Sequence, residues 1–351
     1  MALRLGEELV PSGEAEGIET VLRVQLDLMR KQQDPRQRGE HFKGHGCVRA
    51  EFKVEADIPP AMKIGVFSRP RAFPALIRFS NCVGADDTKP QGHAMALKLL
   101  GVEGEKLLED QKDAQTQDFL LVDYPVFFIR NAIEYAEFFQ ELLDVLQGSK
   151  FMAAHPMIAG SLGMLKFWAT HPKETLIFIE ACKREPASML EVPYWSQVPY
   201  KLGLNACKYA AQPGPENSVG GKPDKSPDYL HQALVEYLTI KRRAARFDFL
   251  VQLQTDPEAM PIEDPTVEWK SEAVKVATIT IPPQEFSSPA QVKFAEDLSF
   301  NPWHALPEHR PLGGISRTRK AVYLGSSRLR HELNRVPVRE PTEQEVRELW
   351  K

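Results

Sequence analysis

Residues 299–334 have the sequence SFNPWHALPEHRPLGGISRTRKAVYLGSSRLRHELN, whose second half is a helical pattern rich in basic residues. Arg319 and Tyr323 are four residues apart and share one helix face, with Arg330 seven residues further along nearly the same stripe. A phenol ordinarily titrates near about 10, but a guanidinium held against its oxygen favours the phenolate, an anionic ligand that ferric haem iron can bind. The same spacing also fits a solvated basic helix with one buried tyrosine, so this motif alone leaves both interpretations open.

Three earlier segments group His, Arg, Ser and aromatic residues close together. They are RGEHFKGHG at 38–46, ALIRFSN at 75–81 and PVFFIRNAIEYAEF at 125–138. With the late basic segment they form an ordered series of four blocks that resembles the haem catalases. That family has an Arg three residues before a distal His, then Arg-Phe-Ser, then Pro-x-Phe-Phe-Ile-Arg-Asp. Its proximal block has Asn-Pro after a Phe, an Arg-x-x-x-Tyr ligand motif, and arginines five and seven residues past the Tyr, which here are Phe300-Asn301-Pro302, Arg319, Tyr323, Arg328 and Arg330.

The resemblance implies a role for each matching residue around a b-type haem. Tyr323 would be the iron ligand, with Arg319 against its phenol. His41 would lie above the iron as the acid–base group, and Ser80 would orient it. The other matching positions would hold the cofactor through its propionates or around its macrocycle, namely Arg38, Arg78, Arg330, Phe127, Tyr135 and Phe138.

Two positions on the distal side depart from the family pattern. The family has Asn-Asn-Thr before the Pro of the third block, and the first Asn helps the His to handle peroxide; here that place holds Val122. An apolar side chain cannot hydrogen-bond peroxide or a bound water. The residue before the distal His is usually Val, or Thr in the coral allene oxide synthases, and here it is Glu40. Efficient dismutation of hydrogen peroxide is therefore not expected.

The resemblance predicts a haem-dependent oxidoreductase that acts on hydrogen peroxide or on organic and lipid hydroperoxides. A peroxidase-type reaction with a small reductant fits the loss of the distal amide better than efficient catalase activity. Two alternatives remain open: a fatty-acid hydroperoxide isomerase of the allene oxide synthase kind, and a haem carrier or sensor without turnover. A haem-free barrel that binds a partner is a third. His41 and Ser80 favour an enzyme, because a carrier needs no proton shuttle.

Short strand-like runs separated by Gly and Pro turns favour an antiparallel barrel or sandwich. With the family resemblance, they predict an α+β fold: a catalase-like antiparallel β-barrel with surrounding helices and the haem ligand on a late helix. We expect an N-terminal helical arm at 1–35, the barrel with inserted helices at 36–290, and a C-terminal segment at 291–351. Strands are predicted at 47–55, 75–80, 94–100, 118–122, 198–208, 246–255 and 274–281, and helices at 17–33, 130–147, 155–169, 172–184, 226–244 and 316–334.

Composition excludes several classes of function. The 351 residues carry a formal net charge of −4 and no basic tract, which argues against a nucleic-acid partner. No apolar run of signal-peptide or membrane-span length is present, and the four cysteines form no CxxC pair. These features predict a cytoplasmic protein with reduced thiols. They leave the oligomeric state open, with a homodimer as one option.

Two competing motifs are weaker. His41 and His45 have the spacing of zinc ligands on a helix, but Gly44 and Gly46 disfavour a helix there, so His45 is expected to be a loop histidine. Residues 159–163, AGSLG, are similar to a nucleophile elbow, yet no predicted strand precedes them. A packed serine is the simpler interpretation. The chain contains no GxGxxG or GxxxxGK[ST] motif for nucleotide chemistry.

Overall fold

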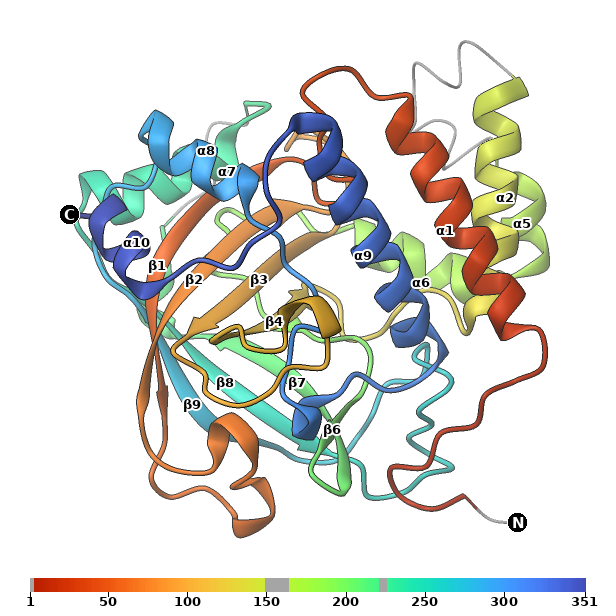
Figure 1. Ribbon diagram of the computed structural model, residues 1–351, viewed down its shortest axis with the longest axis horizontal. Helices are drawn as coiled ribbons and strands as arrows, with labels where there is room; N and C mark the ends of the chain where they lie inside the picture. Colours follow the sequence, from red (N-terminus) through yellow and green to blue (C-terminus); the bar gives the residue numbers. More distant parts are fainter. Residues whose placement is uncertain (1–2, 149–163, 221–225) are drawn as a thin grey trace.

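The computed structural model describes residues 3–148, 164–220 and 226–351. Within these ranges, nine antiparallel strands form one sheet in the order β5-β4-β3-β2-β1-β9-β8-β7-β6, and a β5–β7 pairing closes eight of them into a barrel (Figure 1). The predicted α+β barrel is therefore confirmed. The strands are β1 Gly44–Val54, β2 Ala72–Asn81, β3 His93–Leu100, β4 Thr116–Val122, β5 Tyr194–Trp195, β6 Tyr200–Leu202, β7 Asn205–Pro213, β8 Ala245–Leu253 and β9 Ala273–Ile281.

The barrel is filled by aromatic side chains from alternate strand positions. Phe249 lies on β8 between buried neighbours two residues away on either side, as the period of a strand requires. Its ring centroid is 5.1 Å from those of Phe52 and Phe119, and Phe119 lies 5.0 Å from Tyr209. Edge-to-face contacts of this kind stabilise a core beyond simple area burial. The interior is thus closed by rings, and a ligand site has to lie on the outer wall.

The pairing of the strands determines which side chains lie together on that outer wall. Ser80 on β2 pairs with Ala94 on β3, and Ala94 pairs with Val122 on β4, so these three residues form one row across the sheet. One row further along, Arg78 pairs with Ala96. Because side chains in a row lie on the same face, the predicted serine and arginine share one side of the sheet with small alanines and Val122.

Helices cover this side of the barrel. Helix α1 (Glu14–Arg30) lies between α2 (Ala132–Gly148) and α9 (Gly314–Asn334) in Figure 1, and it contacts both. Two glycines allow α1 to pack closely against α2 and α9. A Cβ at Gly17 would lie 2.8 Å from the carbonyl oxygen of Ala132, and a Cβ at Gly325 would lie 2.6 Å from Leu22. Helices α5 (Leu165–Thr170) and α6 (Pro172–Cys182) continue the layer beside α2.

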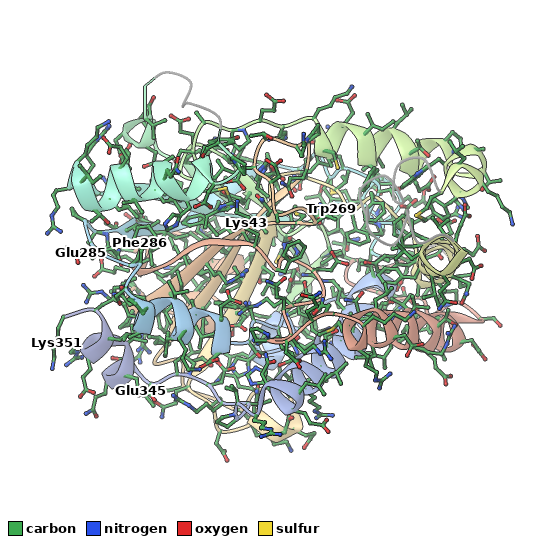
Figure 2. The ribbon with its side chains drawn as sticks, turned by 90° about the horizontal axis from the view of Figure 1, so that it is seen from above. Lys43, Trp269, Glu285, Phe286, Glu345 and Lys351 are labelled. Atoms are coloured by element: carbon green, nitrogen blue, oxygen red, sulfur yellow. The ribbon has the colours of Figure 1, made fainter. Side chains whose placement is uncertain are left out.

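The opposite end carries α7 (Tyr229–Leu234), its π-helical continuation Val235–Ile240, α8 (Pro289–Asp297) and α10 (Glu343–Leu349). Seen from above in Figure 2, Glu345 on α10 and the C-terminal Lys351 lie at the same end of the molecule as Phe286. The Phe286 ring approaches Gly46 so closely that a Cβ there would lie 2.5 Å from it. No helix within the described ranges is long and apolar enough to cross a bilayer.

Several predicted elements differ from the structure. The single strand expected at 198–208 is split into β6 and β7 by a turn at Gly203, whose φ is +63°. Strand β5 and helices α8 and α10 were not predicted, although α8 and α10 each begin with a capping box, Ser288 with Gln291 and Thr342 with Glu345. Part of the helix expected at 155–169, and the AGSLG motif at 159–163, lie outside the described residues.

Candidate haem site

A pocket opens between the outer barrel wall, α9 and the loop that precedes β1. Its empty volume, including the open mouth, is about 820 Å³, within the range of small-molecule and cofactor sites. The row of Ser80, Ala94 and Val122 forms part of its floor. The structure brings together at this pocket seven residues predicted from the sequence: Arg38, His41, Arg78, Ser80, Arg319, Tyr323 and Arg330.

Tyr323 and Arg319 form a pair on α9, as their spacing predicts. Nη2 of Arg319 donates a hydrogen bond to the phenol oxygen of Tyr323 at 3.2 Å. Burial lowers the pKa of Arg319, but the neighbouring phenols of Tyr323 and Tyr200 raise it, and the net pKa lies above its ordinary value. The guanidinium therefore stays charged beside the phenol oxygen, which is the arrangement that favours a phenolate.

Helix α9 is held in place by ion pairs at its first turns. Arg317 contacts three carboxylates: Nε lies 2.5 Å from Glu14, Nη1 lies 2.6 Å from Glu8, and Nη2 lies 2.8 Å from Glu263. These carboxylates come from the N-terminal segment, α1 and the loop after β8, so Arg317 ties three parts of the chain to α9. The half-buried part of α9 that carries Tyr323, six residues further along, is thereby fixed against the barrel.

His41 lies across the pocket on an irregular loop. Its φ is +57°, a left-handed conformation that non-glycine residues seldom adopt, and its N–H donates to the carbonyl of Cys82 at 2.9 Å. Oγ of Ser80 lies 3.5 Å from Nδ1, a long contact at the limit of hydrogen bonding. Burial, and after it the charges of Arg78 and Arg319, lower the pKa of His41 to about 3. The imidazole is therefore neutral at physiological pH.

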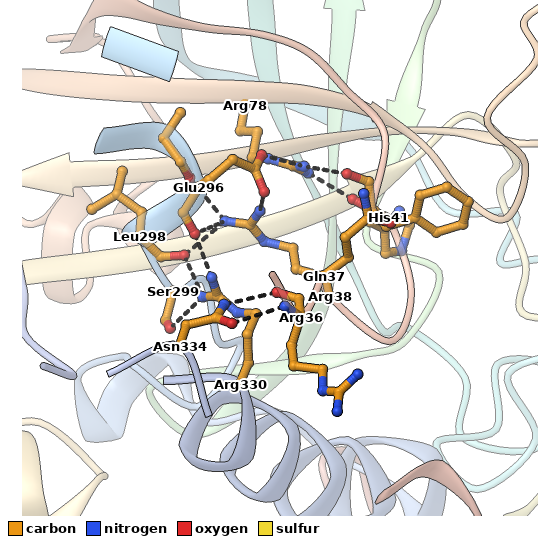
Figure 3. Close-up of polar contacts among 12 residues, drawn as sticks. Arg36, Gln37, Arg38, His41, Arg78, Glu296, Leu298, Ser299, Arg330 and Asn334 are labelled. Atoms are coloured by element: carbon orange, nitrogen blue, oxygen red, sulfur yellow. Dashed lines mark hydrogen bonds and ion pairs between the residues drawn. The ribbon is translucent and has the colours of Figure 1, made fainter. Parts of the chain in front are cut away.

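The three arginines expected to hold propionates converge on the end of α8 (Figure 3). Glu296 forms ion pairs with Arg38 at 2.8 Å and with Arg78 at 3.3 Å. Arg38 and Arg330 both donate to the carbonyl of Leu298, at 2.7 and 3.0 Å. Burial and the charge of Arg38 lower the pKa of Arg78 to about 10 and that of Arg330 to about 9. The three guanidinium groups thus lie around the Glu296 carboxylate, with the charge of Asp297 also acting on Arg330.

Solved structures provide the comparison that identifies the fold. Catalase A from Saccharomyces cerevisiae superposes with a TM-score of 0.64 at 19% identity, covering 96% of this chain and 69% of that chain. A fungal catalase gives a TM-score of 0.59 at 17% identity, covering 96% of this chain and 68% of its own. A bacterial catalase gives 0.59 at 15% identity, covering 97% and 66%. The chain has the catalase fold.

This catalase fold spans about two thirds of the length of those catalases. No protein-family model matches the sequence, and no curated protein matches it either. At these identities the likeness establishes the architecture alone, and the chemistry has to be argued from the residues of the pocket.

The two departures from the catalase pattern both face the pocket. Val122 lies in the wall where the family has an amide, and Glu40 lines the pocket next to His41. Glu40 is exposed by surface area, because it borders the open pocket. The protein atoms packed around its carboxyl group nevertheless raise its pKa to about 7. The distal side therefore has an apolar residue at the position of the family's amide, and a carboxyl group beside His41 at a position that is usually Val or Thr.

The predicted aromatic neighbours form a cluster beside the pocket and are not among its lining residues. Phe127 lies 5.6 Å from Tyr135 between ring centroids, and Tyr135 lies 6.3 Å from Phe138. Burial, then the charges of Glu40 and Tyr323, raise the pKa of the Tyr135 phenol. The proposed packing of these three residues around a macrocycle remains a prediction.

His45 was wrongly expected to lie in a loop. It is buried on β1, where Nε2 lies 2.8 Å from Oδ1 of Asn81, and Asn81 in turn donates to Asp87 at 2.9 Å. Burial lowers the pKa of His45 to about 4. Gly44 and Gly46 disfavour a helix, but they are compatible with a strand that has an irregularity between them. The side chain therefore belongs to a buried polar network behind the distal loop.

Sequence reasoning missed Glu296, which organises the arginine cluster. A lone Glu late in a short helix carries no distinguishing signal, and only the fold brings it beside Arg38, 258 residues earlier in the chain. It also missed Phe300, Val322 and Ser326 as pocket-lining residues. The first two follow from motifs already recognised: Phe300 precedes Asn301-Pro302, and Val322 adjoins Tyr323.

The residues of the pocket fit a haem. The guanidinium groups of Arg38, Arg78 and Arg330, which all line the pocket, suit the two propionates of haem b. The hydroxyl of Ser326, which lines the pocket, is buried without a hydrogen-bond partner within the described residues. Apolar walls from Met29, Met95, Leu121, Phe300 and Val322 suit a flat apolar ring. Tyr323 supplies the oxygen donor that the resemblance predicts for the iron.

Proposed function

We propose that the chain is a haem b-dependent enzyme that acts on hydrogen peroxide or organic hydroperoxides, through a peroxidase-type reaction and not through efficient dismutation. One observation carries the proposal: a tyrosine phenol paired with a charged guanidinium faces a neutral histidine across a pocket rimmed by three arginines. The catalase fold and the four sequence blocks support it. The loss of the distal amide at Val122 supports the choice of a peroxidase-type reaction.

On the proximal side, Arg319 would keep Tyr323 anionic, and the phenolate oxygen would hold the iron. Bound haem would supply a redox-active ferric centre for breaking the O–O bond. Arg38, Arg78 and Arg330 would neutralise the propionates through charge-assisted hydrogen bonds and fix the orientation of the ring. Helix α9 carries both Tyr323 and Arg330, so one rigid element would position the metal and one carboxylate end of the cofactor together.

On the distal side, His41 would accept the proton of an incoming hydroperoxide at its ring nitrogen. Its lowered pKa keeps the ring neutral and therefore ready to accept. Ser80 would orient the ring through Nδ1. Acid–base help of this kind contributes about 10² to 10⁴ in rate. The apolar wall around Val122 would keep water away from the reacting oxygens.

The ligand assignment can be tested by reconstituting the purified protein with haemin. The wild type is expected to show a stable ferric Soret spectrum, and Tyr323→Phe is expected to lose tight haem retention. Tyr124→Phe is the matched control, because Tyr124 lies outside the pocket lining. An unchanged ferric spectrum in Tyr323→Phe would exclude the assignment, and a wild type without any Soret band would favour a haem-free barrel.

Two further measurements separate the alternatives. Rapid mixing with a peracid should give a fast spectral change in an enzyme, whereas a carrier should only bleach slowly. A fatty-acid hydroperoxide supplied without reductant should then be consumed by an isomerase and left largely unconverted by a peroxidase. A requirement for an added electron donor supports the peroxidase.

A further inference from the structure

The loop before β1 turns two neighbouring titratable side chains towards the pocket. Glu40 and His41 both line it, although successive residues of a regular strand would point to opposite faces. The left-handed φ of His41, and the hydrogen bond from its N–H to Cys82, accompany this turn. The backbone therefore presents a carboxyl group and an imidazole to the same space.

Glu40 has no partner of its own. Within the described ranges it makes no hydrogen bond and no ion pair, in contrast to Glu296, which pairs with two arginines on another side of the same pocket. No ion pair therefore compensates the charge of Glu40 when it loses its proton. The carboxyl group is free to meet a ligand that enters the pocket.

The charged groups of the pocket act differently on the two neighbours. Arg78, Arg319 and Arg38 lie close enough to His41 to help burial lower its pKa to about 3. For Glu40, burial is the cause that raises the pKa to about 7. The titratable groups that sense the charge of Glu40 are the Tyr135 phenol on α2 and the Cys82 thiol after β2. Neighbouring groups whose pKa values are shifted in opposite directions are typical of an acid and a base with separate roles.

We propose that Glu40 is a catalytic acid of this site, holding a proton for the leaving oxygen of an organic hydroperoxide while His41 accepts the proton of the oxygen nearer the iron. This inference rests on the proposed function. As the O–O bond breaks, its electron pair leaves with the outer oxygen, which takes the Glu40 proton and departs as an alcohol. The proton on His41 then passes to Glu40, which restores both side chains. The inner oxygen is released as water when the external donor of the proposed function supplies two electrons and solvent supplies two protons.

Fluoride binding to the haem-loaded protein tests this role without turnover. A protonated carboxyl group can donate a hydrogen bond to a bound anion, and an ionised one repels it. The wild-type affinity for fluoride should therefore fall as the pH rises through about 7. Glu40→Gln should remove this change of fluoride affinity near pH 7. Glu40→Val should remove it as well, and should weaken fluoride binding at low pH by about 10- to 100-fold, the contribution of a hydrogen bond to a charged group.

Glu109→Gln provides the matched control, because Glu109 is an exposed carboxylate outside the pocket. It should leave the titration unchanged. If the Glu40 variants bind haem with a normal spectrum but titrate like the wild type, the acid role of Glu40 is wrong and the haem site stands. If no protein binds haem, both proposals fail together.

Discussion

The two sides of the pocket differ in how closely they follow the catalase pattern. On the proximal side, Arg319, Tyr323 and Arg330 occupy one regular helix, and Arg317 anchors that helix through three carboxylates. On the distal side, Glu40 and His41 occupy an irregular loop with a left-handed residue, and Val122 replaces an amide. The difference indicates that the residues proposed to hold a haem follow the family pattern, whereas the residues proposed to act on the substrate depart from it.

The strongest test of the distal side is His41→Ala. We expect the haem to be retained, because its ligand lies across the pocket, and the rate with hydroperoxide to fall about 10²- to 10⁴-fold. Since the pKa of His41 is lowered to about 3, the wild-type rate should show no transition belonging to this residue near neutral pH. Stopped-flow spectra over a pH series measure both effects. A rate within a few-fold of the wild type would remove His41 from the mechanism.

The corresponding test of the proximal side is Arg319→Met, which keeps side-chain length and removes the charge beside Tyr323. This removes a hydrogen bond from a charged group to the phenol oxygen, worth about 10- to 100-fold, so haem affinity should fall by about this factor. Arg319→Lys should recover part of the loss, because it restores the charge without the guanidinium geometry. Haemin titration followed in the Soret region gives the affinities. Equal affinities for all three proteins would mean that the pair does not stabilise the ligand.

Val122→Asn would bring the distal side closer to the catalase pattern. One added amide can make one further hydrogen bond to peroxide, worth about 3- to 10-fold. Oxygen release from hydrogen peroxide should increase by this factor while the ferric spectrum stays the same. Val83→Asn, at an exposed position outside the pocket, serves as the control. A fall in oxygen release would indicate that the apolar wall itself is required.

The sequence predicts the fold and most of the pocket because local patterns encode them. The spacing of Arg319 and Tyr323 specifies a shared helix face, and alternation specifies the strands that align Ser80 with Val122. Long-range contacts are not encoded in this way. The meeting of Glu296 with Arg38, and the burial of His45 beside Asn81, depend on the closure of the whole barrel. The turn that directs Glu40 into the pocket depends on the left-handed conformation of His41, which no sequence pattern predicts.

Glu296 links the two sides of the pocket. Of the substitutions proposed, Glu296→Gln is expected to have the smallest effect. Burial raises the pKa of Glu296, but Arg38 and Arg78 lower it further, so its net pKa lies below the ordinary value. A carboxyl group with a lowered folded-state pKa stabilises the protein above its unfolded pKa, about 4.3, and loses this contribution as the pH falls through the folded value.

Because almost half of this side chain is exposed (45%), solvent screening reduces the loss in the free energy of unfolding to about 1 kcal/mol at neutral pH. Urea denaturation of the haem-free wild type and variant should show this difference in the free energy of unfolding at pH 7 and no difference in acid. Arg38 and Arg330 keep their bonds to the carbonyl of Leu298 in either protein, and Arg78 keeps its bonds to the carbonyls of His41 and Phe42. A difference that persists in acid would mean that Glu296 acts through packing and not through its charge.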